Sequence, residues 1–231
     1  MARPDTLAAL ATLIATRAVR QTPLRVAIDG VDASGKTTLA GELAPLLVEC
    51  GHPVVRASID GFHRSRAERY RRGPDSPEGY YHDAFDYPAL RESLLLPLGP
   101  GGSRRIRRAV FDLATDRPMP TDEEVTPEDA ILLLDGVFLL RPELYDLWDL
   151  RIFVDVPFEV TLARAAQRDL AQFDSAEAVI ARDQRRYIPG QRLYLREARP
   201  RERADVVVDN TDLERPRLVV GGGPAGSTLT P

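Results

Sequence analysis

The chain has 231 residues, of which 43% are hydrophobic and 29% are charged, so it can form one sizeable domain or two small ones and is not wholly disordered. Its net charge of −4 argues against a protein whose main role is to coat nucleic acid. Cys50 is the only cysteine, which excludes an internal disulfide and a metal site built from cysteines.

The sequence also gives an expectation for localisation. It contains no apolar stretch of the ~20 residues that a membrane helix needs. Thr12, Thr16 and Arg17 interrupt the apolar positions near the N-terminus, so that segment lacks a secretory pattern. We therefore expect a cytoplasmic protein that binds neither a membrane nor nucleic acid.

The first 22 residues predict a helix that packs on the core. Asp5 or Thr6 can cap this helix. Apolar residues follow at helical spacing, namely Leu7, Leu10, Ala11, Ile14 and Ala18. Pro23 separates the helix from the apolar run 24–28, which predicts a buried strand that ends at Asp29.

A second strand and helix follow the first. The helix after the first strand places Leu39, Leu43, Leu46, Leu47 and Cys50 on one face, and Gly51 ends it. Residues 53–59 predict a second strand that ends at Asp60.

The remaining elements alternate in the same way. We expect a helix at 88–96, a strand at 106–111, and buried strands at 131–134, 152–156 and 206–208. Helices are expected at 158–170 and 175–187. Short apolar strands that alternate with helices predict an α/β fold, in which helices cover both faces of a parallel sheet.

These elements predict a single domain at 23–213. Residues 61–87 crowd basic and aromatic side chains together, so we expect an insertion there rather than a core element. From Pro216 onward the residues are mostly small and polar, and we expect 214–231 to be a disordered tail.

The strongest motif lies between the first strand and the second helix. Residues 30–37 read GVDASGKT and fit the pattern G-x-x-x-x-G-K-T, with a strand before and a helix after. Gly30 and Gly35 let the backbone wrap so that successive N–H groups point at phosphate oxygens, and the helix adds its positive N-terminal end. The residues expected to bind a nucleoside triphosphate are Gly30, Asp32, Ala33, Ser34, Gly35, Lys36, Thr37 and Thr38.

Lys36 strengthens this interpretation because it is the only lysine of the chain. A compact ammonium on a flexible stem suits a task that a planar guanidinium does not. Lys36 can reach the β- and γ-phosphates of a nucleotide, and the Thr37 hydroxyl can hold Mg²⁺. The alternatives are a lysine that survived a drift toward arginine and an ordinary strand–turn–helix corner.

Six segments in chain order give a more specific indication. They read GVDASGKTTLA, SIDGFHRSRAERY, YYHDAFDYPAL, LLLDGVF, FVDVPFEVTLARAAQRD and RADVVVDNTD, within residues 24–212. Together they resemble the uridine kinase branch of the uridine kinase and phosphoribulokinase family. The resemblance implies a P-loop kinase fold with a mainly parallel five-stranded sheet, and transfer of the γ-phosphoryl group of ATP to a small-molecule hydroxyl. It favours a nucleoside acceptor such as uridine or cytidine.

The resemblance implies a role for two aspartates. Asp60 matches the catalytic aspartate, which accepts or orients the proton of the attacking hydroxyl and lies near the metal. Asp135 ends the apolar run 131–134, as expected of an acid that acts on Mg²⁺ directly or through water. The related kinases usually carry glutamate at this position. For both residues the alternative is a capping aspartate.

A lid at about 158–190 is also implied. Arg164 and Arg168 are four residues apart on one helix face, and in the family such arginines fold over the phosphates. The expected catalytic set is therefore Asp60, Lys36, Arg164 and Arg168. Surface ion pairs with Glu159 or Asp169 are the alternative.

The acceptor side departs from the family's pattern. Phe111 can stack on a base, but Asp116 takes the place of a histidine, and Tyr80 replaces the acid that binds the ribose. Asp83 and His63 complete the expected acceptor-binding set with Asp60. These departures leave other small hydroxyl acceptors open, such as pantothenate, glycerate or a sugar.

The basic run at 64–72 has two interpretations. It can grip an anionic acceptor such as a sugar phosphate, or it can be a solvated helix face, interleaved with Glu68.

Two other function classes are alternatives to a kinase. A GTPase switch needs an Asn-Lys-x-Asp element, for which the chain has no second lysine. A regulator that binds nucleotide without catalysis stays an alternative, and so does assembly into a homo-oligomer.

Overall fold

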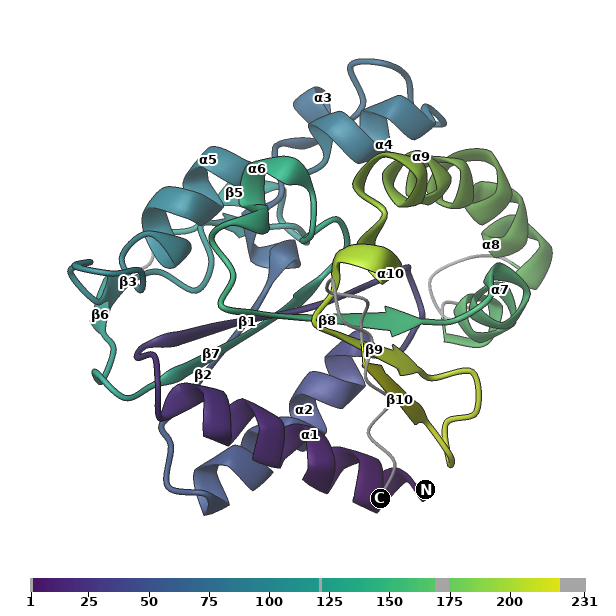
Figure 1. Cartoon of the computed structure of the whole chain (residues 1–231). Helices are drawn as coiled ribbons and strands as arrows, with labels where there is room; N and C mark the ends of the chain where they lie inside the picture. The colour runs from purple at the N-terminus through teal and green to yellow at the C-terminus, as the bar shows by residue number, and fades with distance from the viewer. Residues whose placement is uncertain (1, 121, 169–174, 221–231) are drawn as a thin grey trace.

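A six-stranded sheet forms the centre of the molecule. The computed structural model describes residues 2–120, 122–168 and 175–220 (Figure 1). The sheet has the strand order β10-β9-β8-β1-β7-β2. Its strands are β1 (Leu24–Gly30), β2 (Val54–Ser58), β7 (Ile131–Gly136), β8 (Leu150–Asp155), β9 (Val206–Asp209) and β10 (Arg217–Val220). All neighbours in it are parallel except β9 and β10.

The mainly parallel sheet confirms the expected fold class and corrects one boundary. We expected five strands and a tail without structure from 214, whereas residues 217–220 form the antiparallel edge strand β10. Its apolar stretch 218–220 is short and follows a proline, so its pairing with β9 depends on tertiary context rather than on a local signal. Residues 221–231 lie outside the described residues.

Helices cover both faces of the sheet. They are α1 (Arg3–Ala18), α2 (Lys36–Glu49), α3 (Arg66–Arg69), α4 (Pro77–Asp83), α5 (Tyr87–Leu90), α6 (Pro142–Tyr145), α7 (Phe158–Arg168), α8 (Ala176–Arg182), α9 (Ile188–Ala198) and α10 (Pro200–Arg203). A 3₁₀ turn, η1 (Ile59–Phe62), follows β2, and π-helical turns η2 (Arg91–Leu95) and η3 (Asp183–Tyr187) continue α5 and α8. Residues 169 and 170, the end of the helix expected at 158–170, lie outside the described part of the chain.

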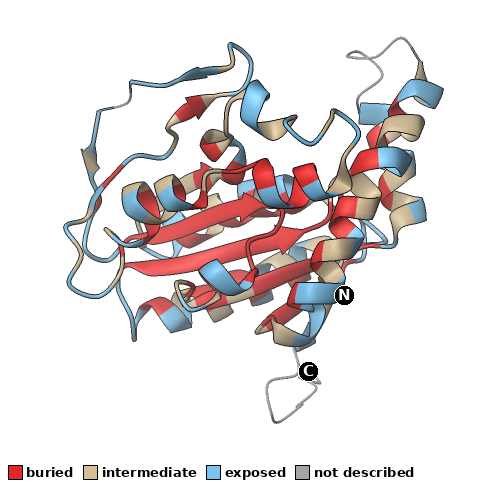
Figure 2. Ribbon diagram, turned by 90° about the horizontal axis from the view of Figure 1, so that it is seen from above, coloured by how far each residue is buried: buried red, intermediate tan, exposed pale blue. Residues whose placement is uncertain are grey.

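Two hydrophobic clusters pack against the sheet, one on each face. The first includes Leu10 and Ile14 of α1 and Leu43 of α2, and these helices lie together on one side in Figure 1. The second includes Tyr81 of α4 and Tyr194 of α9 on the other side. The central strands are buried on both faces (Figure 2), which explains why β1 and β7 are almost continuous apolar runs.

The segment 61–87 belongs to the core, contrary to our expectation of an insertion. Phe62, Tyr81 and Phe85 are at most 2% exposed and pack in the second cluster. Local composition was misleading here because the arginines of the segment are exposed or half-buried, whereas most of its aromatic residues are buried in the second cluster. The buried aromatic rings therefore fix the position of this segment over the carboxyl edge of the sheet.

The expected strand at 106–111 is also wrong. Two separate two-stranded ribbons occupy this region, β3 (Arg105–Ile106) with β6 (Glu124–Val125), and β4 (Phe111–Asp112) with β5 (Arg117–Pro118). Residues 107–110 between β3 and β4 carry few buried apolar side chains, so they do not continue one strand.

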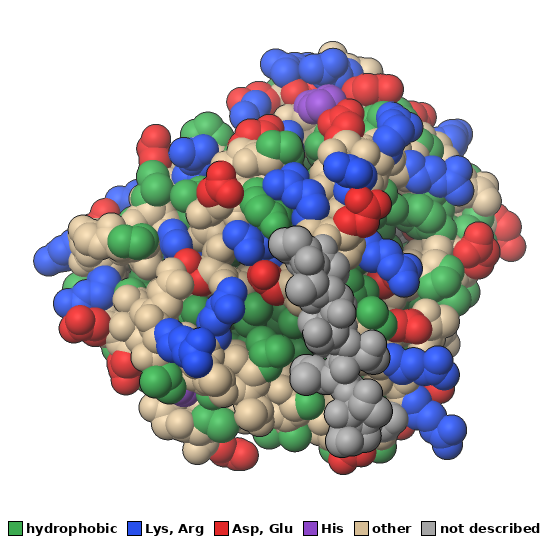
Figure 3. Space-filling view, in the orientation of Figure 1, with side chains coloured by type: hydrophobic (Ala, Val, Ile, Leu, Met, Phe, Trp, Pro, Cys, Tyr) green, Lys and Arg blue, Asp and Glu red, His purple; other side chains and the backbone are tan. Residues whose placement is uncertain are grey.

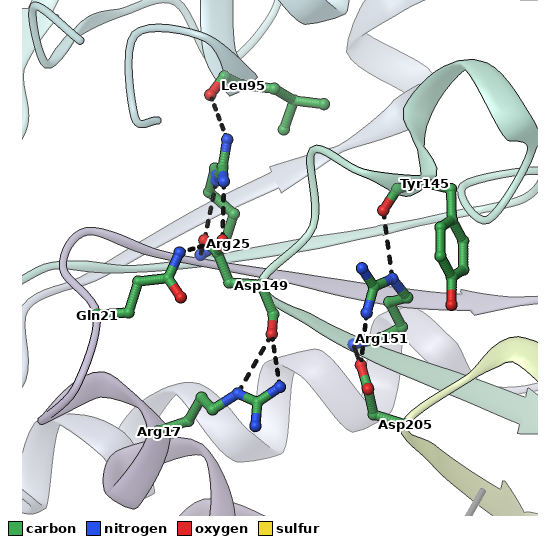
Figure 4. A network of polar contacts seen from close by, with 8 residues as sticks. All are labelled: Arg17, Gln21, Arg25, Leu95, Tyr145, Asp149, Arg151 and Asp205. Atoms are coloured by element: carbon green, nitrogen blue, oxygen red, sulfur yellow. Dashed lines mark hydrogen bonds and ion pairs between the residues drawn. The ribbon is translucent and has the colours of Figure 1, made fainter. Parts of the chain in front are cut away.

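A polar network fixes the edge of the sheet opposite the phosphate-binding motif (Figure 4). Arg25 at the start of β1 forms two hydrogen bonds of 2.8 and 2.9 Å to the Asp149 carboxylate, which precedes β8. Both side chains are about 95% buried. Arg151 of β8 forms an ion pair with Asp205, the residue directly before β9, with 3.2 Å between Nη1 and Oδ2. Three neighbouring strands are therefore tied at this edge.

Charged side chains of both signs are mixed on one face of the molecule. On the face drawn in Figure 3, basic and acidic side chains are interspersed, with hydrophobic side chains scattered among them. Among the described residues, no helix combines the length and apolar character needed to span a bilayer.

Candidate active site

The carboxyl ends of three adjacent strands bring the predicted polar residues together. β7 lies between β1 and β2, and Asp135 is in register with Ile28 of β1 and Ser58 of β2. The loop 30–37 leaves β1, and Asp60 follows β2 by two residues. Open parallel sheets bind ligands at this edge, because their loops and helix N-termini converge there.

The loop 30–37 has the backbone shape that its glycines predict. Gly35 has a φ of +92°, and a Cβ there would approach Asn210 Nδ2 to 2.6 Å. A Cβ on Gly30 would lie 2.7 Å from both Ser34 Oγ and the carbonyl oxygen of Val154. Asn210, which follows β9, also donates to the Ser34 carbonyl at 2.8 Å. A residue that follows β9, two strands away from β1 in the sheet, therefore fixes the closed shape of the loop.

Two side chains of this loop suit a phosphate ligand. The Ser34 hydroxyl is buried and has no hydrogen-bond partner among the described residues. Lys36 is 9% exposed, and its Nζ donates to the Val31 carbonyl at 3.0 Å, which places the ammonium inside the loop. A phosphate oxygen would satisfy both groups, and the N-terminus of α2 points at the same place.

Thr37 and Asp135 meet at the carboxyl edge of the sheet. The Thr37 hydroxyl donates to Asp135 Oδ2 at 2.6 Å, and Arg56 Nη2 donates to Oδ1 of the same carboxylate at 2.9 Å. Asp135 is 2% exposed, so Arg56 offsets a buried negative charge. Oxygen ligands fit Mg²⁺, which takes most of its other ligands from water and phosphates.

Asp60 faces this pair from the 3₁₀ turn η1. The Ser58 hydroxyl accepts a hydrogen bond of 3.3 Å from the Asp60 amide, which begins the turn directly after the strand. The Asp60 side chain is 71% exposed, so a ligand can reach its carboxylate. Desolvation by the surrounding walls of the site raises the pKa of Asp60. The positive charges of His63 and Lys36 lower this pKa, and the negative charges of Asp32 and Asp135 raise it further.

His63 lies beside Asp60 and beneath an aromatic ring. Its Nδ1 is 3.1 Å from the Asp60 carbonyl oxygen, and its ring meets Phe85 edge to face with 4.4 Å between centroids. Burial lowers the pKa of His63 below its ordinary value, against the opposing charge of Asp60. A neutral imidazole is therefore favoured at this position.

Two cavities meet at the loop. The P-loop cavity, of about 670 Å³, is lined by Ala33, Gly35, Thr38 and Arg164 among others. The acid cleft, of about 480 Å³, is lined by Asp32, Asp60, His63 and Tyr80 among others. Lys36, Thr37 and Arg168 line both cavities. A group transferred between ligands in the two cavities would therefore pass between these three side chains.

The two lid arginines differ in position. Arg164 Nη2 donates to the backbone carbonyls of Asn210 and Thr211, each at 2.9 Å, and the side chain lines only the P-loop cavity of the two. Arg168, one turn later on α7, lines both. The structure thus brings Arg168, rather than Arg164, to the place where the cavities meet. Residues 169–174 of the expected lid lie outside the described residues.

The expected acceptor residues are not all assembled. His63 and Tyr80 line the acid cleft, but Asp83 and Phe111 line none of the cavities described here. Both oxygens of Asp83 are engaged by Arg71 and Arg72 at 2.6 and 2.7 Å, and Phe111 is buried in a short ribbon. Leu113 lines the cleft instead of Phe111.

Tyr80 and Asp116 also have roles that the sequence did not predict. The Tyr80 hydroxyl donates to Asp32 Oδ2 at 2.8 Å, and Gln191 Nε2 donates to the same oxygen at 2.6 Å. Asp116 accepts from the Arg66 amide at 2.8 Å and from Arg69 at 3.0 Å. Tyr80 and Gln191 thus connect the phosphate-binding loop to α4 and α9.

Some residues that contact the loop or line the acid cleft were not predicted from the sequence, among them Gln191, Asn210, Tyr187 and Asp183. Asn210 lies in the segment RADVVVDNTD that carries the resemblance, so its position directly after a strand was an available signal. Gln191 and Tyr187 lie in helices with no motif, and only the packing of α9 against α4 brings them to the site.

Comparison with known proteins agrees with this geometry. The sequence profile of the phosphoribulokinase / uridine kinase family matches residues 26–212. The chain belongs to this family. It is therefore a phosphotransferase that acts on a hydroxyl acceptor, and the family implies the use of ATP, usually with Mg²⁺.

Individual relatives are similar over most of the domain. The uridine kinase of Leuconostoc citreum is 29% identical over 154 residues, which cover 64% of this chain and 69% of the relative. The uridine kinase of Alkaliphilus metalliredigens is 29% identical over 154 residues, with coverage of 65% and 70%. The solved structure of a possible uridine kinase from Bacillus stearothermophilus superposes with a TM-score of 0.67 at 26% identity, covering 86% of this chain and 97% of that one.

Proposed function

We propose that this kinase transfers the γ-phosphoryl group of ATP, in the presence of Mg²⁺, to a hydroxyl of a small molecule bound in the acid cleft. The observation that carries the proposal is the position of Lys36, Thr37 and Arg168 between the two cavities. Two positive side chains and a magnesium-binding hydroxyl are the groups that a transferring phosphoryl group needs around it.

The P-loop cavity is suited to the nucleotide. Backbone N–H groups of the loop, the Ser34 hydroxyl and the Lys36 ammonium would hold the phosphates. Thr37 would hold Mg²⁺, with Asp135 fixing the orientation of the Thr37 hydroxyl through their 2.6 Å hydrogen bond. When bound, Mg²⁺ would offset the charge of the β- and γ-phosphates.

Asp60 is suited to the acceptor. Its carboxylate would take the proton of the attacking hydroxyl while the oxygen of that hydroxyl forms a bond to the γ-phosphorus. The bond from this phosphorus to the bridging oxygen of ADP breaks, and ADP leaves with the electron pair. Arg168 would stabilise the charge on the transferring group and exclude water from it.

The names of the relatives specify a nucleoside as their acceptor. Their names favour uridine as a candidate for this chain. Against it stand the positions of Phe111, which lines none of the cavities, and Tyr80, whose hydroxyl is engaged by Asp32. A nucleoside therefore enters the proposal as one member of an acceptor panel.

The experiment is phosphoryl transfer measured by mass spectrometry with ATP, Mg²⁺ and a panel of nucleosides, pantothenate, glycerate and sugars. We expect a product heavier by one phosphoryl group from at least one acceptor. Asp60→Asn should lower kcat about 100- to 10,000-fold, because general-base catalysis contributes that much. Since the pKa of Asp60 is raised, the wild-type rate should fall on the acid side as this carboxylate takes up a proton.

Two results would contradict these assignments. Nucleotide binding without a phosphorylated product would indicate the alternative, a regulator that does not catalyse. Full turnover by Asp60→Asn would exclude Asp60 as the base. Glu92→Gln is the matched control, because Glu92 lies in η2 and lines neither the P-loop cavity nor the acid cleft.

A further inference from the structure

A third cavity, of about 380 Å³, adjoins the acid cleft. We call it the arginine cavity because Arg66, Arg69, Arg182 and Arg186 line it. His63, Tyr80, Leu113, Arg182 and Tyr187 line both this cavity and the acid cleft. A molecule with its hydroxyl at Asp60 can therefore extend past His63 into the arginine cavity.

The two spaces differ in their balance of charge. The acid cleft is lined by the carboxylates of Asp32, Asp60, Asp135 and Asp183 and by the positive side chains of Lys36, Arg168 and Arg182. The arginine cavity is lined by four guanidinium groups and by one carboxylate, that of Asp116. Asp116 accepts a hydrogen bond from Arg69 at 3.0 Å, so one of the four positive charges is offset within the cavity wall. An excess of positive charge is left.

Aromatic rings hold these arginines by their flat faces. The guanidinium carbons of Arg66, Arg69 and Arg186 lie 5.7, 5.6 and 4.7 Å from the centroid of the Tyr70 ring. That of Arg182 lies 4.9 Å from the Tyr187 ring. A ring that holds a guanidinium in place leaves the N–H groups that have no other acceptor available for a carboxylate or phosphate.

Arg186 is the most deeply placed of the four. It is 3% exposed, and its terminal nitrogens donate to the backbone carbonyls of Arg69, Gly73 and Pro74. The Nε–H groups of Arg186 and Arg69 are buried and have no acceptor among the described residues. A buried cation with an unfilled donor is costly, and an anionic ligand would reduce that cost. Burial also lowers the pKa of Arg186.

We propose that the acceptor of this kinase carries an anionic group, a carboxylate or a phosphate, which binds in the arginine cavity while its hydroxyl lies at Asp60. The proposal rests on the proposed kinase function and specifies its substrate class. A neutral nucleoside would not offset the excess of positive charge in the cavity wall. The anionic group also fixes which hydroxyl of the acceptor reaches Asp60.

The experiment compares matched pairs of neutral and anionic acceptors. The pairs are pantothenol with pantothenate, glycerol with glycerate, and fructose with fructose 6-phosphate, with uridine and cytidine as further neutral acceptors. Initial rates give kcat/KM for each, and calorimetry gives binding of each without ATP. We expect the best substrate to be anionic and to exceed its neutral partner by at least about 30-fold, as expected for a desolvated charge pair. The pairs also distinguish a carboxylate from a phosphate.

Variants of the cavity test the assignment. Arg66→Gln and Arg182→Gln should each raise KM for the anionic acceptor about 10- to 100-fold while KM for ATP changes little. Arg66 is exposed, so its substitution should not disturb folding. Arg64→Gln is the matched control, because Arg64 belongs to the same basic run but lines none of the cavities. The control should keep the wild-type KM.

The outcomes separate this inference from the proposed function. Turnover of a neutral acceptor at least as fast as its anionic partner, with KM unchanged in Arg66→Gln and Arg182→Gln, would overturn the inference and leave the kinase function in place. Anion binding that these variants weaken, without a phosphorylated product from any acceptor, would support an anion site in the arginine cavity and contradict the kinase function on which the assignment of an acceptor rests.

Discussion

Arg164 and Arg168 lie one turn apart on α7 but meet different groups. Arg164 donates to the carbonyls of Asn210 and Thr211 after β9, whereas Arg168 lies where the P-loop cavity and the acid cleft meet. An arginine that satisfies backbone carbonyls stabilises a loop. An arginine at the junction of two ligand cavities can stabilise charge that develops during transfer.

This difference predicts distinct kinetic effects. Arg168→Met should lower kcat about 100-fold or more, because it removes a group that would stabilise the transition state. Arg164→Met should mainly raise KM for ATP and lower the melting temperature, since two carbonyls lose their donor. Steady-state kinetics with varied ATP and acceptor measures both. Equal losses of kcat in the two variants would contradict the separate roles.

Asp29 is a buried acid that no part of the proposed chemistry uses. It is fully buried at the end of β1, where it accepts hydrogen bonds from the Tyr194 hydroxyl and from the Leu139 amide. Burial raises the pKa of Asp29 to about 6, against the opposing effect of these hydrogen bonds. The folded protein therefore holds this proton more tightly than the unfolded chain, whose aspartate has the ordinary pKa of 3.8.

The stabilising contribution of this proton is predicted to be fully present below pH 4 and to be lost as the pH rises to 6. The wild type should lose about 3 kcal/mol of unfolding free energy over this interval relative to Asp29→Asn, which does not titrate. Urea unfolding of both proteins from pH 4 to 7 measures the difference. A difference that stays constant over this range would show that Asp29 does not titrate there.

At the scale of elements, the site depends on contacts at both edges of the sheet. At the carboxyl edge, Tyr80 of α4 and Gln191 of α9 hold Asp32 of the phosphate-binding loop. At the opposite edge, Arg25 and Asp149 join β1 to the start of β8. The first set of contacts positions a ligand, whereas the second fixes the strands that carry the loop.

The Arg25–Asp149 pair should therefore affect stability more than catalysis. Asp149→Asn leaves the buried Arg25 charge without its partner, which typically costs about 3–5 kcal/mol. We expect the melting temperature to fall by about 10 °C, with KM for ATP unchanged at low temperature. Thermal unfolding by circular dichroism measures this shift. Asp146→Asn, at an exposed position, is the control, and an equal melting temperature for the two variants would contradict the role of the pair.

The elements differ in how far the sequence predicted them. The central strands and the loop 30–37 were predictable, because their signals are local: continuous apolar runs and glycines at fixed spacing. Strand β10 and the core position of 61–87 were not. Both depend on what the segment packs against, and a run of arginines hid the buried aromatic residues of 61–87.

At the scale of the whole molecule, three cavities follow one another along the carboxyl edge of the sheet. The P-loop cavity meets the acid cleft at Lys36 and Thr37, and the acid cleft meets the arginine cavity at His63. The sequence predicted the residues of the first junction, whose motif is contiguous. It could not predict the arginine cavity, which joins residues of α3 to residues of α8 and η3 that lie more than a hundred positions later in the chain.

The central claim is that the γ-phosphate lies between the P-loop cavity and the acid cleft. A crystal structure with Mg²⁺ and a non-hydrolysable ATP analogue tests it most directly. We expect a γ-phosphate in contact with Lys36 and Arg168, with the side opposite its bridging oxygen toward Asp60. A triphosphate bound elsewhere, or one whose γ-phosphate faces away from Asp60, would contradict it.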